Sequence, residues 1–258
     1  MSAAAHSVAL SKRSILGIFR QPQMWVPSMF FPLFFAALNT AALGRSTSLP
    51  GFPEADSFLD FMLAATIAQG VLFGGLSQAS EIAQDIENGF FERLVAAPTA
   101  RTAILLGRLA GSAALGTLMA ALFIVVFTLF GAEVKAGPAG YAWLLLVGMF
   151  LSTAIGSVGA AFALRIGVVE AVQSVFPVLF ISLFLSSAFF PLTLMNGWFK
   201  AVASGNPLSW MVDGMRHLVL EGWSTSEALA AAGVPAVITA LGLVLSLRQL
   251  QRRLAVAA

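Results

Sequence analysis

The feature that most limits the fold of this chain is a series of apolar stretches, each about as long as a bilayer is thick. The hydrocarbon core of a membrane needs a helix of about 20 mostly apolar residues. We expect such spans at residues 25–43, 61–80, 103–130, 141–164, 171–190 and 228–247. In lipid, every backbone polar group needs an internal partner, so these stretches form helices. The sequence therefore predicts an all-α membrane protein with six transmembrane helices.

The composition supports a membrane protein and excludes several other classes. Only 10% of the residues are charged, whereas soluble domains carry about 25%. The net charge is +2 and the basic residues are scattered, so we expect no nucleic-acid partner. The absence of cysteine excludes disulfides, thiolate zinc sites and cysteine nucleophiles. We expect no cleavable signal peptide, because no small-residue cleavage pattern follows the first apolar stretch.

Three segments outside the spans have patterns of their own, within a single transmembrane domain that we expect to cover residues 1–258. Residues 7–20 place apolar side chains on one side of a helix and arginines opposite, which predicts an N-terminal interfacial helix. Residues 195–222 contain tryptophans, which favour the headgroup region of a bilayer, and predict short outer re-entrant helices. Residues 81–102 predict a cytoplasmic loop.

The loop at residues 81–102 is the longest charged passage in the chain, and it contains a second helical pattern. Asn88-Gly89 should end the helix that leads out of the second span, because glycine adopts the left-handed conformation at helix ends at little cost. A short amphipathic helix follows and is ended by Pro98. Its apolar face consists of Phe90, Phe91, Leu94 and Val95, and its charged face of Glu92 and Arg93.

Acidic residues crowd the end of the helix before this short helix: Glu81, Asp85 and Glu87. The helix dipole disfavours negative charge there by a few tenths of a kcal/mol each, so basic groups should offset them. Three arginines are near enough in sequence, namely Arg93, Arg101 and Arg108. The alternative reading is a solvated loop that merely follows the positive-inside tendency.

The distribution of basic residues predicts the orientation of the chain. If both ends and the loop at residues 81–102 are cytoplasmic, most arginines lie inside, as the positive-inside rule requires. Only Arg45, Lys135, Lys200 and Arg216 then fall outside. We therefore expect a multi-pass protein of a bacterial cytoplasmic (inner) membrane, with both termini in the cytoplasm.

The sequence contains no pattern for catalysis, for a metal or for a bound cofactor. No predicted span carries an ionisable residue near its centre, as ion-coupled carriers usually need. Ser186 and Ser187 have no histidine and aspartate arrangement around them. No lysine follows a glycine, so the phosphate loop G-x-x-x-x-G-K-[ST] is missing. We expect a non-enzyme that binds no cofactor itself, with any ATP and Mg²⁺ on a separate subunit.

Three motifs occur in order and extend over most of the chain. The first is Glu87-Asn88-Gly89-Phe90-Phe91-Glu92-Arg93-Leu94, followed by Pro98, Arg101 and Leu106-Gly107-Arg108. The second is Ser187-Ala188-Phe189-Phe190-Pro191, and the third is Asn206-Pro207-Leu208 with Asp213 and Arg216. With the predicted topology, they resemble the ABC transporter type-2 permease family, most closely its drug- and lipid-exporting members of the daunorubicin-resistance type.

The resemblance implies that residues 81–102 are a coupling loop, whose short helix rests in a groove of a separate ATP-binding subunit. It implies two such subunits bound to two permeases, which are either identical or sister chains. The implied ATPase-coupling residues are Glu87, Gly89, Phe90, Phe91, Glu92, Arg93, Leu94 and Pro98. The implied outer motif consists of Asn206, Pro207, Asp213 and Arg216.

The function that follows is a permease subunit of an ATP-driven exporter. It would move amphipathic drugs or lipids outward among the membrane lipids, and its substrate would be hydrophobic. Two alternatives stay open: a structural or assembly subunit that transports nothing, and a secondary carrier. The sequence does not identify the individual substrate.

Overall fold

The structure, a computed structural model, describes residues 3–20, 22–96 and 101–256. These residues form helices joined by loops, without a strand in those ranges, which confirms the all-α prediction. Five of the helices are long and apolar enough to cross a membrane. They are α2 (Pro22–Leu43), α3 (Phe58–Glu87), α5 (Arg101–Leu129), α6 (Gly137–Ile166) and α11 (Thr225–Val256).

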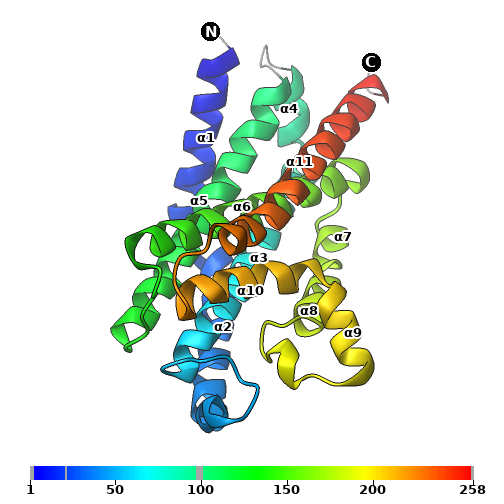
Figure 1. Cartoon of the computed structure of the whole chain (residues 1–258). Helices are drawn as coiled ribbons and strands as arrows, with labels where there is room; N and C mark the ends of the chain where they lie inside the picture. Colours follow the sequence, from blue (N-terminus) through cyan, green and yellow to red (C-terminus); the bar gives the residue numbers. More distant parts are fainter. Residues whose placement is uncertain (1–2, 21, 97–100, 257–258) are drawn as a thin grey trace.

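Six further α-helices in the described ranges are shorter. They are α1 (Ala3–Arg20), α4 (Phe90–Ala96), α7 (Val169–Gln173), α8 (Phe176–Phe184), α9 (Gly197–Gly205) and α10 (Pro207–Leu220), with 3-10 turns at Gly44–Ser48 and Leu192–Leu194. Figure 1 shows α1, α4 and the C-terminal end of α11 at one end of the molecule. Helix α9 and the loop that follows α2 lie towards the other end. Two short helices thus occupy residues 195–222, as predicted.

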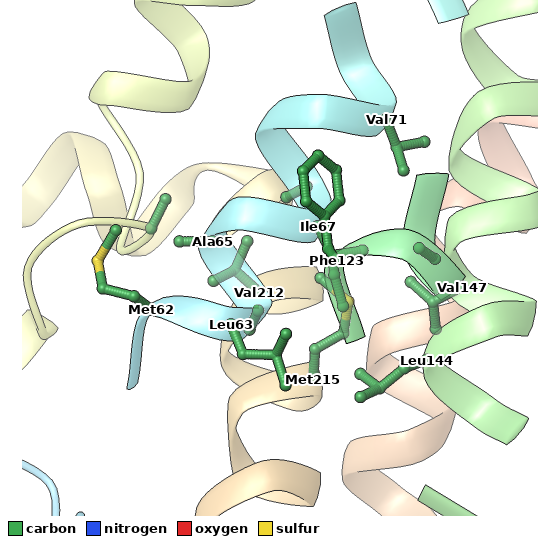
Figure 2. Packing of buried hydrophobic residues seen from close by; sticks show 14 of the residues in the cluster. Met62, Leu63, Ala65, Ile67, Val71, Phe123, Leu144, Val147, Val212 and Met215 are labelled. Atoms are coloured by element: carbon green, nitrogen blue, oxygen red, sulfur yellow. The ribbon is translucent and has the colours of Figure 1, made fainter. Parts of the chain in front are cut away.

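Helix α3 is the centre of the fold. Of its most apolar part, 89% is buried within the protein, compared with 11% for α2. Side chains from α5, α6 and α10 pack against it, including Phe123, Leu144 and Met215 (Figure 2). The α3 helix begins with a capping box, in which Ser57 and Asp60 satisfy each other's backbone N–H groups. One continuous, buried helix therefore joins the two ends of the protein.

The fifth predicted span, residues 171–190, differs from the prediction. Its apolar helical stretch runs from Val169 to Phe184, is shorter than the other spans, and is interrupted between α7 and α8. Pro177 lies in the first turn of α8. A proline is tolerated there because the N–H that it lacks has no helical partner anyway, and it favours a new helix start.

The predicted end of this span at Phe190 is wrong, because the backbone after Leu185 bonds to α10 instead of continuing the helix. The Ser187 N–H donates to Ser209 Oγ over 2.9 Å. The carbonyls of Ser187 and Ala188 accept hydrogen bonds from Arg216. Side chains of α10 thus provide the partners that another turn of helix would have supplied.

Glycines on α6 allow the close approach of neighbouring helices. A Cβ atom at Gly159 would lie 2.2 Å from the Cβ of Ala79 on α3. A Cβ at Gly233 on α11, in contrast, would meet no atom within 4 Å. The α3–α6 contact therefore depends on the missing side chain at position 159.

We expect Gly159→Ala to destabilise the protein by about 1–3 kcal/mol, the usual cost of overpacking. The matched variant Gly233→Ala should be neutral or slightly stabilising, because alanine is the better helix former. Thermal unfolding in detergent, compared for the two variants, checks this. Equal unfolding midpoints for the two variants would contradict the prediction that the α3–α6 contact needs a glycine at position 159.

Candidate functional site

The site begins where α3 ends and α4 begins. The α3 helix stops at Glu87, with Asn88 as its C-terminal cap, and Gly89 has a φ of +69°. This left-handed conformation favours glycine, as the sequence predicted. The Asn88 side chain accepts a hydrogen bond of 3.0 Å from the N–H of Phe90, the first residue of α4. A tight turn of fixed geometry therefore connects the two helices.

The two faces of α4 have different surroundings. Phe91 is 5% exposed and packs in a cluster with Ile82 of α3 and Ile104 of α5. Leu94 is partly buried against the same cluster, whereas Glu92 and Arg93 are exposed. The apolar face thus attaches α4 to the protein's own helices, and the charged face remains accessible from outside. Pro98 lies outside the described residues.

The acidic end of α3 is neutralised mainly by one arginine. Arg108 of α5 forms ion pairs with both Glu81 and Asp85. Glu87 accepts a hydrogen bond of 3.0 Å from the N–H of Val169. Arg93 instead lies 5.8 Å from the ring centroid of Phe90. Of the three arginines that the sequence offered, Arg108 is confirmed as a partner, and the side chain of Arg101 is outside the described part of the chain.

Arg253 of α11 belongs to this site, although the sequence analysis did not single it out. Its Nη2 lies 3.4 Å from Glu92 Oε1, and its Nη1 donates to the carbonyl of Leu164 over 3.2 Å. Its guanidinium also lies 5.7 Å from the centroid of Phe91. One feature of the sequence could have indicated this position. Arg253 follows Leu250 by three residues, so the two side chains share a helical face, and Leu250 is buried. Arg253 therefore joins α4, α6 and α11.

The outer motif forms a second polar centre. The Asn206 side chain caps α10 by accepting from the N–H of Leu208, and Pro207 occupies the first turn of that helix. The Asn206 amide also donates to the carbonyls of Ser182 and Leu185, over 2.7 and 3.0 Å. Asn206 thus holds the start of α10 against the end of α8.

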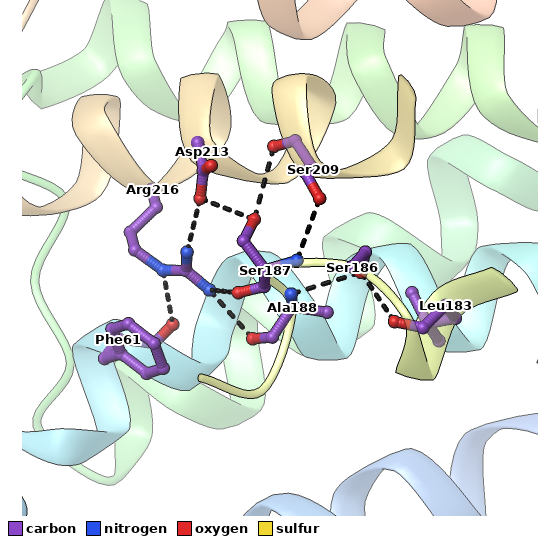
Figure 3. A network of polar contacts seen from close by, with 8 residues as sticks. All are labelled: Phe61, Leu183, Ser186, Ser187, Ala188, Ser209, Asp213 and Arg216. Carbon is purple, nitrogen blue, oxygen red and sulfur yellow. Dashed lines mark hydrogen bonds and ion pairs between the residues drawn. The ribbon is translucent and has the colours of Figure 1, made fainter. Parts of the chain in front are cut away.

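Arg216 is the hub of this outer centre (Figure 3). It is 4% exposed, and its Nη1 lies 2.7 Å from Asp213 Oδ1. Its Nη2 donates to the carbonyls of Ser187 and Ala188 over 3.0 and 2.8 Å. Its guanidinium stacks 3.9 Å from the ring centroid of Phe61. The second and third sequence motifs therefore meet in one network at the start of α3.

Burial lowers the pKa of Arg216 to about 10, because an apolar environment disfavours the charged form. The carboxylate of Asp213 acts in the opposite direction, so the guanidinium stays protonated at neutral pH. The network is therefore a charged, hydrogen-bonded clasp. Within the described ranges, no group of three or more His, Asp or Glu side chains gathers closely enough to hold a metal ion.

A helical protein of this kind, with several apolar spans and a short amphipathic helix at one end, has the features of a membrane permease subunit. The chain belongs to the ABC-2 type transporter family, whose family model matches residues 6–220. It is therefore a multi-pass membrane permease without ATPase activity, and permeases of this family pair with an ATP-binding subunit.

Two relatives extend this comparison. The chain is 25% identical to ycf38 of Porphyra purpurea over 224 residues, which is 86% of this chain and 76% of the relative. It is 27% identical to ycf38 of Pyropia yezoensis over 225 residues, again 86% and 76%. Both relatives are provisionally named transport permeases, and neither name specifies a substrate.

Proposed function

We propose that this chain is the permease subunit of an exporter that moves amphipathic drugs or lipids outward across a bacterial cytoplasmic membrane. The observation that carries the proposal is the two-sided environment of α4. Its apolar face is anchored among α3, α5 and α11, and its charged face, with Glu92 and Arg93, is exposed. A helix held in this way transmits a push from a bound partner to the spans.

In this proposal, residues 81–102 form the coupling loop, and two ATP-binding subunits supply ATP hydrolysis with their own Mg²⁺. Glu87, Gly89, Phe90, Phe91 and Leu94 position the helix, while Glu92 and Arg93 meet the partner. Both termini then lie in the cytoplasm with α4, in agreement with the excess of arginines at that end. Two permeases, identical or sister chains, enclose the path.

The substrate class is inferred from an apolar groove between α2, α3 and α8. The groove has a volume of about 720 Å³ and is lined by Phe31, Phe73, Phe176 and Phe180, with Ser77 and Gln173 among its polar residues. Pockets of 300–1,000 Å³ with apolar walls and a few polar groups suit small amphipathic molecules. The adjacent α2 exposes further phenylalanines, Phe30 and Phe34, which gives a second permease an apolar face to pack on.

Copurification in mild detergent tests the proposal first, since an ATP-binding subunit should accompany the chain. We then expect hydrophobic amphipathic compounds to raise the ATPase activity of the reconstituted complex several-fold, because substrate in the groove favours the coupled state. Ser77→Trp should reduce this stimulation by narrowing the groove. Val125→Trp, at a position on α5 that is 54% exposed, is the matched control.

Two results would contradict the proposal. Absence of any ATP-binding partner would favour an assembly subunit that transports nothing. Stimulation by polar sugars alone would overturn the hydrophobic substrate class while leaving the pairing with an ATPase intact.

A further inference from the structure

A polar pocket of about 330 Å³ lies between α1, α3 and α5, and Leu94 of α4 also lines it. Three arginines line it, namely Arg13, Arg20 and Arg108, together with the acidic residues Glu81 and Asp85. The proposed contact with an ATPase uses the exposed face of α4 and does not involve this pocket. Its chemistry therefore needs its own explanation.

The charges in the pocket do not balance. Arg108 is already paired with both Glu81 and Asp85. Arg13 lies 4.1 Å from the ring centroid of Phe90, which orients its guanidinium without neutralising it. Neither Arg13 nor Arg20 has a carboxylate within ion-pair distance among the residues that the structure describes. Both side chains are exposed, so two cationic groups at the rim of the pocket are available to an anion.

The donors for such an anion are the guanidinium groups, because each presents several N–H groups to an oxyanion. The buried Ser14 in the same wall turns its Oγ towards α5, where a Cβ atom at Gly111 would lie 2.1 Å away. The Ser14 hydroxyl is therefore not one of the donors.

The pocket lies beside a surface that is suited to lipid. On the other side of α1, Val8 and Phe19 are 68% and 62% exposed, and Leu16 is also exposed. Leu10 of α1 lies against Gly107 of α5, and Ser14 one turn later lies against Gly111, so α1 runs alongside the first turns of this span. The exposed apolar side of α1 is then turned towards lipid at the same end of the molecule. Under the proposed orientation, this interface belongs to the cytoplasmic leaflet, which carries anionic headgroups.

We propose that this pocket binds one phosphate group, with Arg13 and Arg20 as its ligands, and that the group belongs to an anionic phospholipid of the inner leaflet. The lipid holds α1 against α5 and lies next to Phe90 of α4. Binding depends on the pocket and the orientation of the chain, and not on which substrate is exported.

Native mass spectrometry of the full chain in detergent, with phosphatidylglycerol added, tests the proposal. Arg13→Gln/Arg20→Gln should lower retention of the lipid about tenfold, since a charge-assisted hydrogen bond contributes about that factor. Gly17→Leu provides a test that keeps every charge. Gly17 lines the pocket and a Cβ there meets no atom within 4 Å, so a leucine fills the space without disturbing the helix. Retention of the lipid by Gly17→Leu should fall by about the same factor as in the double arginine variant.

The matched control is Arg248→Gln/Arg252→Gln, which removes two exposed arginines from α11 at the same end of the molecule. Retention by this control should equal that of the unchanged protein. Unchanged retention in both pocket variants overturns the proposal, as does an equal loss in the control, because diffuse charge would then explain binding. Competition with inorganic phosphate distinguishes the two sources of the phosphate group. If inorganic phosphate displaces phosphatidylglycerol, the pocket binds a free anion and the lipid proposal is overturned. If the lipid stays bound, the result supports a phospholipid headgroup.

Discussion

Glu92→Arg is expected to reduce export at least tenfold while the permease remains folded and inserted in the membrane. The Glu92 side chain is 55% exposed, and its contact with Arg253 is long at 3.4 Å. Surface ion pairs of this kind contribute only about 0–1 kcal/mol, so folding should change little. A reversed charge facing a partner's groove, in contrast, costs several kcal/mol. ATP hydrolysis should continue, uncoupled from export, in proteoliposomes that contain the complex.

A charge swap separates the two roles that Glu92 could have. If its function were only to hold Arg253, the double variant Glu92→Arg/Arg253→Glu would restore export, because the internal pair is rebuilt. We expect no restoration, since the partner still meets an arginine at position 92. Arg252→Glu, at the exposed neighbouring position, controls for charge added to α11. Normal export by Glu92→Arg at normal expression would contradict the coupling role.

The parts of the fold that were predictable depend on local chemistry. The turn at Asn88-Gly89 and the amphipathic pattern of α4 are determined within about ten residues, and both agree with the structure. Arg108 was predictable as a partner of the acidic residues because it lies in the first turns of α5, shortly after the same loop. The coupling role of these residues stays a prediction.

The features that were not predictable depend on contacts between distant segments. Glu92 and Arg253 are separated by 161 residues, and no periodicity in the sequence connects them. The end of α8 was misplaced for the same reason, since its next backbone groups bond to Ser209 and Arg216 on another helix. Hydropathy identifies an apolar segment, but tertiary hydrogen bonds decide where its helix stops.

The arrangement of α3 connects the two polar centres. One end of α3 carries Glu81 and Asp85, which pair with Arg108 beside α4. The other end carries Phe61, whose ring and carbonyl both contact Arg216. Because the helix between them is almost wholly buried, we expect a displacement of α4 that moves α3 to move the outer centre as well. A mechanical role for the Arg216 network is thus a prediction from this arrangement.

Arg216→Ala should destabilise the protein by about 3–5 kcal/mol, the largest effect on stability that we expect. Removing one partner of a buried ion pair leaves the other groups unsatisfied, here Asp213 and the carbonyls of Ser187 and Ala188. Arg216→Lys should recover only part of the loss, because an ammonium cannot reproduce the planar fork of the guanidinium. The midpoint of thermal unfolding in detergent measures both effects.

Asp213→Asn should cost less than Arg216→Ala, because the Asp213 side chain is 37% exposed and water replaces part of the lost interaction. Lys200→Ala, at an exposed basic position on α9, should leave the midpoint unchanged. The order of midpoints, with Arg216→Ala lowest, then Arg216→Lys, then Asp213→Asn, is the signature of a buried clasp centred on the guanidinium. If Arg216→Ala unfolded at the same temperature as Lys200→Ala, the outer network would not be what holds α10 and the loop that follows α8 together. Movement of α3 could then not pass through this network.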